Sequence, residues 1–460
     1  MKKRYEIDMC GGSLADKILL FALPLMASSL LQLLFNAADV VVVGRYAGKE
    51  ALAAVGSNAS IINLMINVFL GLATGTNVVV ARDLGRGRED QVSKSVHTSM
   101  TMALISGVFM AVVGVVVIRQ ILEWMSSPTD IIDLATLYLR IYFLGMPALL
   151  AYNFGAAILR AQGDTQRPLY YLTFAGVVNV VLNLVLVVQF HLDVAGVALA
   201  TIASQYISAA LVLRCLLREQ GPLRLDLKKL GLERDVVVRI LKVGLPAGFQ
   251  GVLFSLSNVA IQSSLNSFND PVIVAGSSTA SNLEGFVYAG MNAFQQTGIT
   301  FVSQNYGAGQ CKRVDRVIVQ CLIFVTGVGL VLGNLLYFFG VPLASAYVQP
   351  GETEVVEQAV VRMAIIACPY FLCGIMDVLA GVQRGLGYSI IPMFISLVGV
   401  CALRLLWVAF VFPLSPTPVC LYISYPVTWI VTLLAHTGFL IFVVRKRAYA
   451  KAARYAAREA

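Results

Sequence analysis

The sequence predicts an all-α polytopic membrane protein with about twelve transmembrane helices, and three observations support this fold class. Hydrophobic residues make up 58% of the chain and charged residues only 13%, whereas soluble domains average about 25% charged residues. The mean hydropathy is +0.79. The apolar residues form separate runs, and roughly 20 apolar residues suffice to cross a bilayer. Finally, landmarks of the first half recur in the second half, which indicates an internal repeat.

Each predicted span runs from one charged or turn-rich break to the next. In order, the spans cover residues 17–44, 52–81, 92–118, 132–158, 168–190, 194–217, 239–267, 277–303, 314–340, 356–383, 392–412 and 420–444. We expect no cleavable signal peptide, because the first apolar run is too long for the apolar region of such a peptide and continues as a span.

Basic residues lie mainly in alternate loops. Lys and Arg precede the first span and follow the second, fourth, sixth, eighth, tenth and twelfth spans. Loops rich in Lys and Arg stay on the cytoplasmic side, so both termini are predicted to be cytoplasmic. The formal net charge of +9 therefore reflects membrane topology and does not indicate a nucleic-acid-binding patch. Residues 445–460 are predicted to form a basic cytoplasmic tail.

Four landmarks of the first half return in the second half at nearly one offset. Three pairs share the same offset in residue number, namely Pro24 and Pro246, Gly85 and Gly307, and Arg140 and Arg362, and RAQGDTQRP at Arg160 returns as RGLGYSIIP at Arg384, two positions later than that offset. We therefore predict two homologous lobes of six helices, residues 1–222 and 223–444, whose junction lies in the basic linker 218–238. Because six is even, both lobes enter the membrane from the same side, and such a parallel repeat favours a transporter over a channel.

A polar stripe follows the first predicted span. Ser28, Gln32, Asn36 and Asp39 fall on one side of a helix at about 100° per residue. A carboxylate in hydrocarbon costs roughly 2.5–3.5 kcal/mol, so such a residue usually faces a bundle interior or a wet cavity. The stripe favours a functional Asp39, although Arg45 follows closely and the acid could simply reach water at the outer mouth.

Further polar residues lie within predicted spans, most of them in the second half. Asp377 stands about 10 Å, or two helical turns, before Arg384, and is either functional or a structural carboxylate. Glu284 either attracts a cationic ligand into an outward cavity or sits in headgroup water. Gln295 either lines a cavity or joins helices. Arg140 and Arg362 are expected to be structural, pairing with carbonyl groups or an acid.

The two halves are chemically unequal at equivalent positions. Gln32, Asn36 and Asp39 correspond to Phe254, Asn258 and Ile261, and Asp377 corresponds to Asn153. One half therefore contains the acid of the first-span stripe, while the other has only the amide of Asn258 there.

The sequence offers no sign of an enzyme, a metal site or a resident cofactor. The eight cysteines form no CxxC pair, and most lie in apolar runs, where a free cysteine behaves as a small hydrophobe. The three histidines are scattered, and no HExxH, GxSxG or Walker motif is present.

Several segments together resemble the MATE (multidrug and toxic compound extrusion) transporters, in particular their MepA-like bacterial branch. The resemblance covers nearly the whole chain and rests on four segments: PLMASSLLQLLFNAADVVVVGRYAGKEALAAVG, the repeated RxxG…P, VSQNYGAG, and SYPVTW at Ser424–Trp429. It implies two lobes arranged as a V in the bacterial cytoplasmic membrane. It also implies a monomer that exports cationic or amphipathic compounds in exchange for inward H⁺ or Na⁺.

The resemblance also implies roles for particular residues. The family's first-span acid matches Asp39, which implies cation coupling there together with Asn36, and Pro24 is implied as a helix bend. The fifth-span acid common in MepA-like sequences is replaced by Asn179 and Asn183. Amides bind Na⁺ or a carboxylate but take up no proton, so the coupling ion stays open.

The expected substrate cavity comprises Gln32, Asn258, Glu284, Gln295 and Asp377. An alternative function within the same superfamily is a lipid-linked oligosaccharide flippase. Such a protein is expected to line its cavity with several Arg or Lys residues, whereas the deep spans contain few cations.

Overall fold

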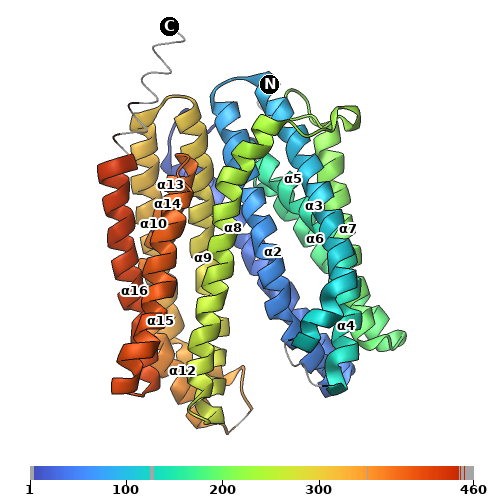
Figure 1. Ribbon diagram of the computed structural model, residues 1–460, viewed down its shortest axis with the longest axis vertical. Coiled ribbons are helices and arrows are strands. Elements are labelled where there is room, and N and C mark those ends of the chain that lie inside the picture. The colour runs from blue at the N-terminus through green and yellow to red at the C-terminus, as the bar shows by residue number, and fades with distance from the viewer. Residues whose placement is uncertain (1–4, 125–128, 350, 445, 447–449, 451–460) are drawn as a thin grey trace. The chain divides into compact units, whose positions relative to one another are not determined.

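The computed structural model describes residues 5–124, 129–349, 351–444, 446 and 450, and these residues form helices joined by loops, with no β-strand among them (Figure 1). A helix satisfies its backbone hydrogen bonds within one segment, which a span in lipid requires. The prediction of an all-α fold is therefore confirmed. The predicted basic tail falls outside the described residues except for Lys446 and Ala450.

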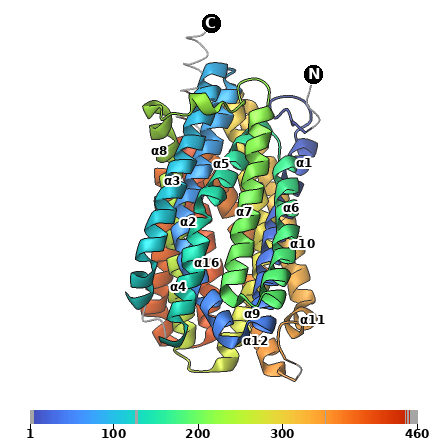
Figure 2. The same cartoon turned by 90° about the vertical axis from the view of Figure 1, so that its right-hand side faces the viewer.

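The helices follow the predicted spans closely. The first seven are α1 (Ala15–Tyr46), α2 (Gly48–Gly85), α3 (Glu89–Trp124), α4 (Thr129–Leu144), α5 (Met146–Gln162), α6 (Gln166–Asn183), which continues as the π-helix η1 (Leu184–Gln189), and α7 (Asp193–Arg218). The linker contains only the 3₁₀ turn η2 (Leu227–Lys229). Figure 2 shows α6 and α7 side by side.

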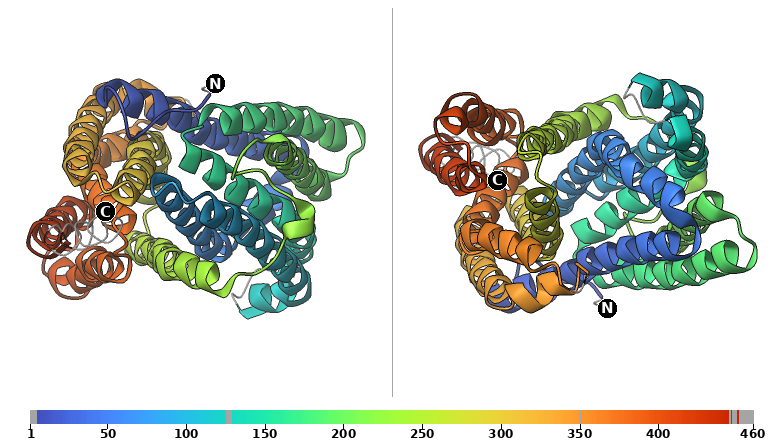
Figure 3. Two further views of the ribbon diagram at one scale, coloured as in Figure 1. Left: turned by 90° about the horizontal axis from the view of Figure 1, so that it is seen from above. Right: turned by 90° about the horizontal axis from the view of Figure 1, so that it is seen from below.

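The helices that follow the linker begin with α8, and the last two spans among them include π-helical turns. They comprise α8 (Arg234–Asn266), α9 (Pro271–Gly307), α10 (Cys311–Phe338), α11 (Gly340–Ser345), α12 (Thr353–Ile366), α13 (Phe371–Gly385), α14 (Ile390–Ser396), η3 (Leu397–Ala402), α15 (Leu403–Leu406), η4 (Trp407–Val411), η5 (Phe412–Leu414), α16 (Pro418–Phe439) and η6 (Leu440–Val444). Figure 3 shows the last two spans, in orange-red and red, side by side.

Among the described residues, nine helices are long and apolar enough to cross a membrane, and the number rises to eleven if two bent pairs each form one span. The pairs are α4 with α5, bent by 46°, and α12 with α13, bent by 49°. The predicted span 277–303 corresponds to α9, which is not among these nine or eleven and whose 37 residues include many Ser, Thr, Asn and Gln. Its end at Gly307 is the repeat equivalent of Gly85, where α2 ends.

The chain divides into two compact units that exchange the starts of two helices. Unit 1 comprises residues 1–8 and Ala27–Gly248, and unit 2 comprises Met9–Met26 and 249–460. The boundaries within α1 and α8 fall at repeat-equivalent positions, and each lies two residues after a proline inside the helix, Pro24 or Pro246. The internal repeat therefore includes the two points, one within α1 and one within α8, at which the chain passes from one unit to the other.

In unit 1, the first half of α8 packs closely on α2 through small residues. Gly71 and Gly75 of α2 face Gly244 and Gly248 of α8, so each helix presents a GxxxG motif to the other. A methyl group added to Gly75 would lie 2.6 Å from the carbonyl oxygen of Ile240. Small residues at this spacing let helix backbones approach within a membrane.

In unit 2, the first half of α1 packs on α9, which is the equivalent helix pair. The rings of Phe21 and Phe301 meet edge to face with centroids 5.4 Å apart, and Met26 lies beside Gly290. The same architecture is thus held by glycines in unit 1 and largely by aromatic packing in unit 2.

The repeated RxxG motif ends a helix in each unit. Gly163 and Gly387 adopt the left-handed conformation, with φ of 102° and 94°. The next backbone N–H reaches back in both cases, from Asp164 to the Leu159 carbonyl and from Tyr388 to the Gln383 carbonyl. This hydrogen bond belongs to the Schellman motif, which favours glycine at its left-handed position and so explains the repeated residue.

Candidate functional site

Asp39 lies on α1 in unit 1, and its side chain contacts α6. Its half-buried carboxylate accepts a hydrogen bond from the amide nitrogen of Asn183, the last residue of α6. The same amide nitrogen lies 3.4 Å from the Asn179 side-chain oxygen, and both asparagines are buried. The structure therefore brings together three of the four residues that the sequence analysis placed at the coupling position.

The remaining residues of the first-span stripe stay near this cluster on the same helix. Asn36 and Gln32 are exposed and lie on the turns of α1 before Asp39. The side-chain oxygen of Asn183 is buried and has no hydrogen-bond partner among the described residues. Two kinds of oxygen, a carboxylate and an amide, are thus available at this position, and both suit a hard cation.

Glu284 and Arg362 of unit 2 form a buried, bidentate ion pair. The Arg362 Nε and Nη2 atoms lie 3.1 and 2.9 Å from the two Glu284 carboxylate oxygens, and Nη1 donates to the Ser277 hydroxyl at 2.7 Å. The residues are only 4% and 5% exposed. Arg362 thus pairs with an acid and Arg140 donates to the Val115 carbonyl at 3.2 Å, so each arginine has one of the two kinds of partner expected for it. With its carboxylate engaged in this pair, Glu284 is better suited to joining α9 and α12 than to holding a ligand.

Asp377 and Gln295 lie inside unit 2 and are buried. The Asp377 carboxyl lies close to the Tyr288 side chain. The Gln295 side-chain oxygen accepts a hydrogen bond from Asn292 at 2.9 Å, one turn earlier on α9. Asp377 and Gln295 therefore each lie against a polar side chain of unit 2 itself.

Arg404 is a buried cation whose partners are neutral. It is 3% exposed, lies on the short helix α15, and stacks 4.1 Å from the ring centre of Tyr425. Its guanidinium donates to the Asn258 side-chain oxygen at 3.3 Å and to the Thr428 hydroxyl at 3.4 Å. Asn258 itself is exposed on α8, so this network reaches the surface of unit 2.

Sequence reasoning missed a second buried network in unit 2. The His436 Nδ1 lies 3.0 Å from the Gln383 side-chain oxygen, and its Nε2 lies 3.0 Å from the Ser396 hydroxyl. The Gln383 amide in turn donates to the His436 carbonyl at 2.8 Å. The ring is therefore a donor at Nδ1 and an acceptor at Nε2. Nothing local in the sequence marks these residues, because 53 positions separate Gln383 from His436.

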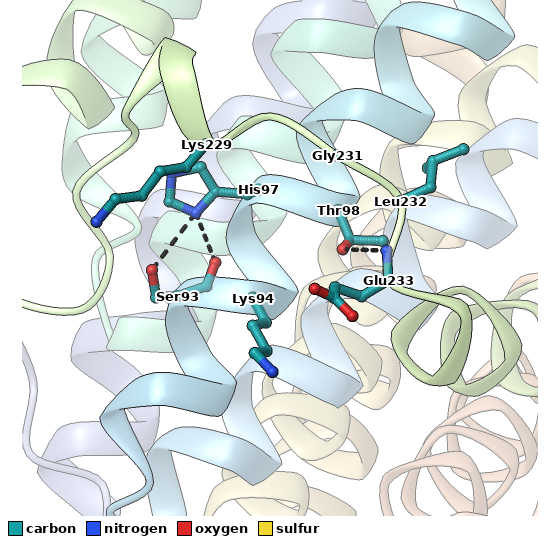
Figure 4. A pocket seen from close by; sticks show the side chains of 8 residues that line it. All are labelled: Ser93, Lys94, His97, Thr98, Lys229, Gly231, Leu232 and Glu233. Atoms are coloured by element: carbon teal, nitrogen blue, oxygen red, sulfur yellow. Dashed lines mark hydrogen bonds between the residues drawn. The ribbon is translucent and has the colours of Figure 1, made fainter.

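A polar pocket of about 360 Å³ lies between α3 and the linker in unit 1 (Figure 4). His97 Nε2 accepts the Asp226 backbone N–H at 3.0 Å, and the Thr98 hydroxyl accepts that of Glu233 at 3.2 Å. These bonds fasten the linker to α3. The pocket contains none of the residues predicted to bind ion or substrate, so we assign it to the linker.

The fold and these polar clusters define a class of protein. Two repeat-related helical units, each with polar side chains in spans that are otherwise apolar, are the architecture of a secondary membrane transporter.

Comparison with known proteins identifies the family. The MatE family model matches twice, at residues 24–185 and 246–409, so the two matches start at the repeat-equivalent residues Pro24 and Pro246. Together the matches span more than half of the chain, and the chain belongs to the MatE family. The resemblance to MATE transporters and the prediction of repeated lobes are thereby confirmed.

Relatives support this assignment over nearly the full length. The probable multidrug resistance protein YoeA of Bacillus subtilis is 27% identical over 437 residues, which cover 93% of this chain and 94% of the relative. An FAD transporter of Shewanella oneidensis is 24% identical over 414 residues, which cover 88% and 89%. The solved outward-facing structure of a MATE family transporter of the MOP superfamily has a TM-score of 0.89 at 19% identity, covering 98% of this chain and 99% of that one. This likeness concerns the fold.

Proposed function

We propose that this protein is a secondary active efflux antiporter of the bacterial cytoplasmic membrane, which works as a monomer. It exports cationic or amphipathic organic compounds in exchange for inward H⁺ or Na⁺, and Asp39 binds the coupling ion. The proposal rests on the hydrogen bond that the Asn183 side-chain amide donates to the Asp39 carboxylate, which joins α6 to α1 in unit 1.

The proposed coupling follows from charge. A bare carboxylate within a membrane span is costly, and binding of a cation removes that cost. The cation therefore changes which of two packings of unit 1 is more stable, by the difference between its affinities for the two states. Alternate states of this kind, with access to one side and then the other, are how a repeat-built transporter moves its cargo.

The relatives' names leave the cargo open. One is named a probable multidrug resistance protein and another an FAD transporter, so the family name alone fixes no substrate. The amide-rich surroundings of Asp39 accommodate Na⁺ through oxygen atoms, and the carboxylate accommodates H⁺.

The proposal is tested by ethidium uptake into inside-out membrane vesicles, driven separately by a pH gradient and by a Na⁺ gradient. We expect the wild-type protein to respond to one of the two gradients, which names the coupling ion. We expect Asp39→Asn to respond to neither, because the amide carries no charge for the ion to neutralise.

Asp133→Asn provides a matched control, since Asp133 is an exposed acid on α4 in the same unit. This variant is expected to transport like the wild type. Unchanged gradient-driven transport by Asp39→Asn would contradict the assignment of Asp39 and make Asp377 the next residue to test. Wild-type uptake that follows neither gradient would contradict antiport.

A further inference from the structure

We propose that Arg404 is a binding site for an anionic group of the exported substrate, such as a carboxylate or a phosphate ester. The substrates then include amphipathic aromatic compounds that carry an anionic group, with or without a cationic one. The inference rests on the proposed export function and refines its substrate.

The buried charges inside unit 2 do not balance. The Asp, Glu and Arg side chains that are more than nine-tenths buried among its described residues are Glu284, Asp377, Arg362, Arg384 and Arg404. Even with both acids ionised, three cations face two anions. Glu284 pairs with Arg362, and Asp377 lies two turns before Arg384 on α13. Arg404 forms an ion pair with no acidic side chain in the described part of the chain.

The hydrogen bonds that Arg404 donates to side chains are long. Its contacts to Asn258 and Thr428, at 3.3 and 3.4 Å, exceed the 2.7–3.2 Å usual for an N–H···O bond. The buried Nε atom has no hydrogen-bond partner among the described residues. A guanidinium stacked on a tyrosine ring still offers N–H groups at its edge, in the geometry that suits a carboxylate or phosphate. The site thus has unused donors and a missing charge.

Arg404 and Asn258 join the same pair of spans in unit 2 that Asn183 and Asp39 join in unit 1. In unit 1, the span α6–η1 supplies Asn183 to Asp39 on the second half of α1, and the two residues are 144 positions apart. In unit 2, the equivalent span supplies Arg404 to Asn258 on the second half of α8, 146 positions apart. Asn258 is the repeat equivalent of Asn36, one turn from Asp39. The same helix pair therefore presents an acid in one unit and a cation in the other.

The local backbone and the neighbouring rings also fit a binding position. Arg404 lies on a single α-helical turn between the π-helical segments η3 and η4, and π-helical turns occur frequently at functional sites. Trp429 stacks on Tyr370 with ring centroids 5.2 Å apart and meets Tyr425 edge to face at 5.9 Å. Tyr425 is half-buried, so an aromatic ligand body can extend this group of rings from the guanidinium outward.

The test measures binding to the purified protein in neutral detergent, without any gradient. The probes are a rhodamine dye with a free carboxylate and the methyl ester of the same dye, followed by fluorescence anisotropy. We expect the wild-type protein to bind the acid about tenfold or more tightly than the ester, since a hydrogen bond to a charged group is among the stronger ones. Arg404→Gln should bind the two dyes equally, and Arg404→Lys should restore part of the preference.

A second variant guards against misfolding of Arg404→Gln. Asn258→Asp places a carboxylate where the amide oxygen now meets the guanidinium, on an exposed residue, and so supplies the missing anion within the protein. We expect it to lose the preference for the acid. Asn266→Asp adds the same charge at an exposed position two turns further along α8 and should keep the preference.

Equal binding of acid and ester by the wild type, or a preference that survives Arg404→Gln and Asn258→Asp, would overturn the proposal. Displacement of the acid by phosphatidylglycerol but not by phosphatidylcholine would assign the position to a lipid phosphate and overturn it as a substrate site. Because no gradient is needed, this result is independent of whether Asp39 couples transport. If Asp39→Asn transports like the wild type while the wild-type protein still prefers the acid dye to the ester, only the assignment of Asp39 as the coupling residue would be rejected.

Discussion

At the scale of single residues, the membrane interior of this protein contains charges that differ in how they are compensated. The Arg362–Glu284 pair is complete, with two hydrogen bonds between the charged groups and a third to Ser277. Arg404, by contrast, has only neutral hydrogen-bond partners among the described residues. Removing one partner of such a pair is costly, because the other ion is then buried alone. A buried guanidinium without an acidic partner can instead pair with an anionic group of a ligand.

The first prediction concerns the buried ion pair. Arg362→Gln should reduce the free energy of unfolding by about 3–5 kcal/mol, because it leaves the Glu284 carboxylate buried without a counter-charge. The measurement is the fraction of monodisperse protein that survives heating in detergent. Arg362→Gln combined with Glu284→Gln should recover part of the loss.

Arg119→Gln is the control for this prediction. Its side chain is 51% exposed and lies 3.2 Å from Glu123, and exposed pairs contribute at most about 1 kcal/mol. Equal heat sensitivity of the Arg362 and Arg119 variants would show that burial does not increase the loss of stability caused by breaking an ion pair.

At the scale of helices, close packing within each unit depends on the exchanged segments. The contact between α2 and α8 in unit 1 is backbone to backbone, through Gly71, Gly75, Gly244 and Gly248. The equivalent contact between α1 and α9 uses larger side chains. The repeat has therefore kept the helix pairing while changing the residues that make it.

The second prediction concerns this glycine contact. Gly75→Ala should destabilise unit 1 by about 1–3 kcal/mol, because its methyl group would meet the Ile240 carbonyl and the backbone of Gly244, which cannot move aside as a side chain can. Loss of heat-resistant protein in detergent is the measurement. Gly327→Ala on α10, where a methyl group meets nothing within 4 Å, should have little effect. A Gly75→Ala protein as stable as the Gly327→Ala protein would mean that the helices separate without cost.

At the scale of the whole molecule, the compact units do not coincide with the two halves of the chain. Residues Met9–Met26 belong to unit 2 although they lie in the first half of the chain. Residues 239–248, which follow the linker in the second half, belong to unit 1. Each half of the chain therefore lacks a segment that completes its unit.

The third prediction tests this exchange. The fragments 1–222 and 223–460, each expressed alone, should be degraded in the membrane, because unit 1 then lacks the first half of α8 and unit 2 lacks the first half of α1. Expressed together, the two fragments should regain gradient-driven ethidium transport. Protease digestion of membranes and the vesicle assay are the measurements. A protease-resistant fragment 1–222 on its own would show that the α8 segment is dispensable.

The sequence by itself determined the features that depend on local pattern. Long apolar runs must form helices in lipid, so the spans, from the first at α1 to the last at α16, were predictable, as was the internal repeat with its Gly163–Gly387 pair. The polar stripe that ends at Asp39 could also be found, because residues of one helix face recur at fixed intervals.

Only the tertiary structure decided which polar groups meet. Asp39 and Asn183 are 144 positions apart, Arg404 and Asn258 146, and no local pattern encodes such a contact. The structure also determined that Glu284 is engaged by Arg362 and that α1 and α8 each contribute to both units. The physical reason is that the cost of a buried charge depends on its three-dimensional neighbours, whereas the tendency to form a span depends on the composition of one segment.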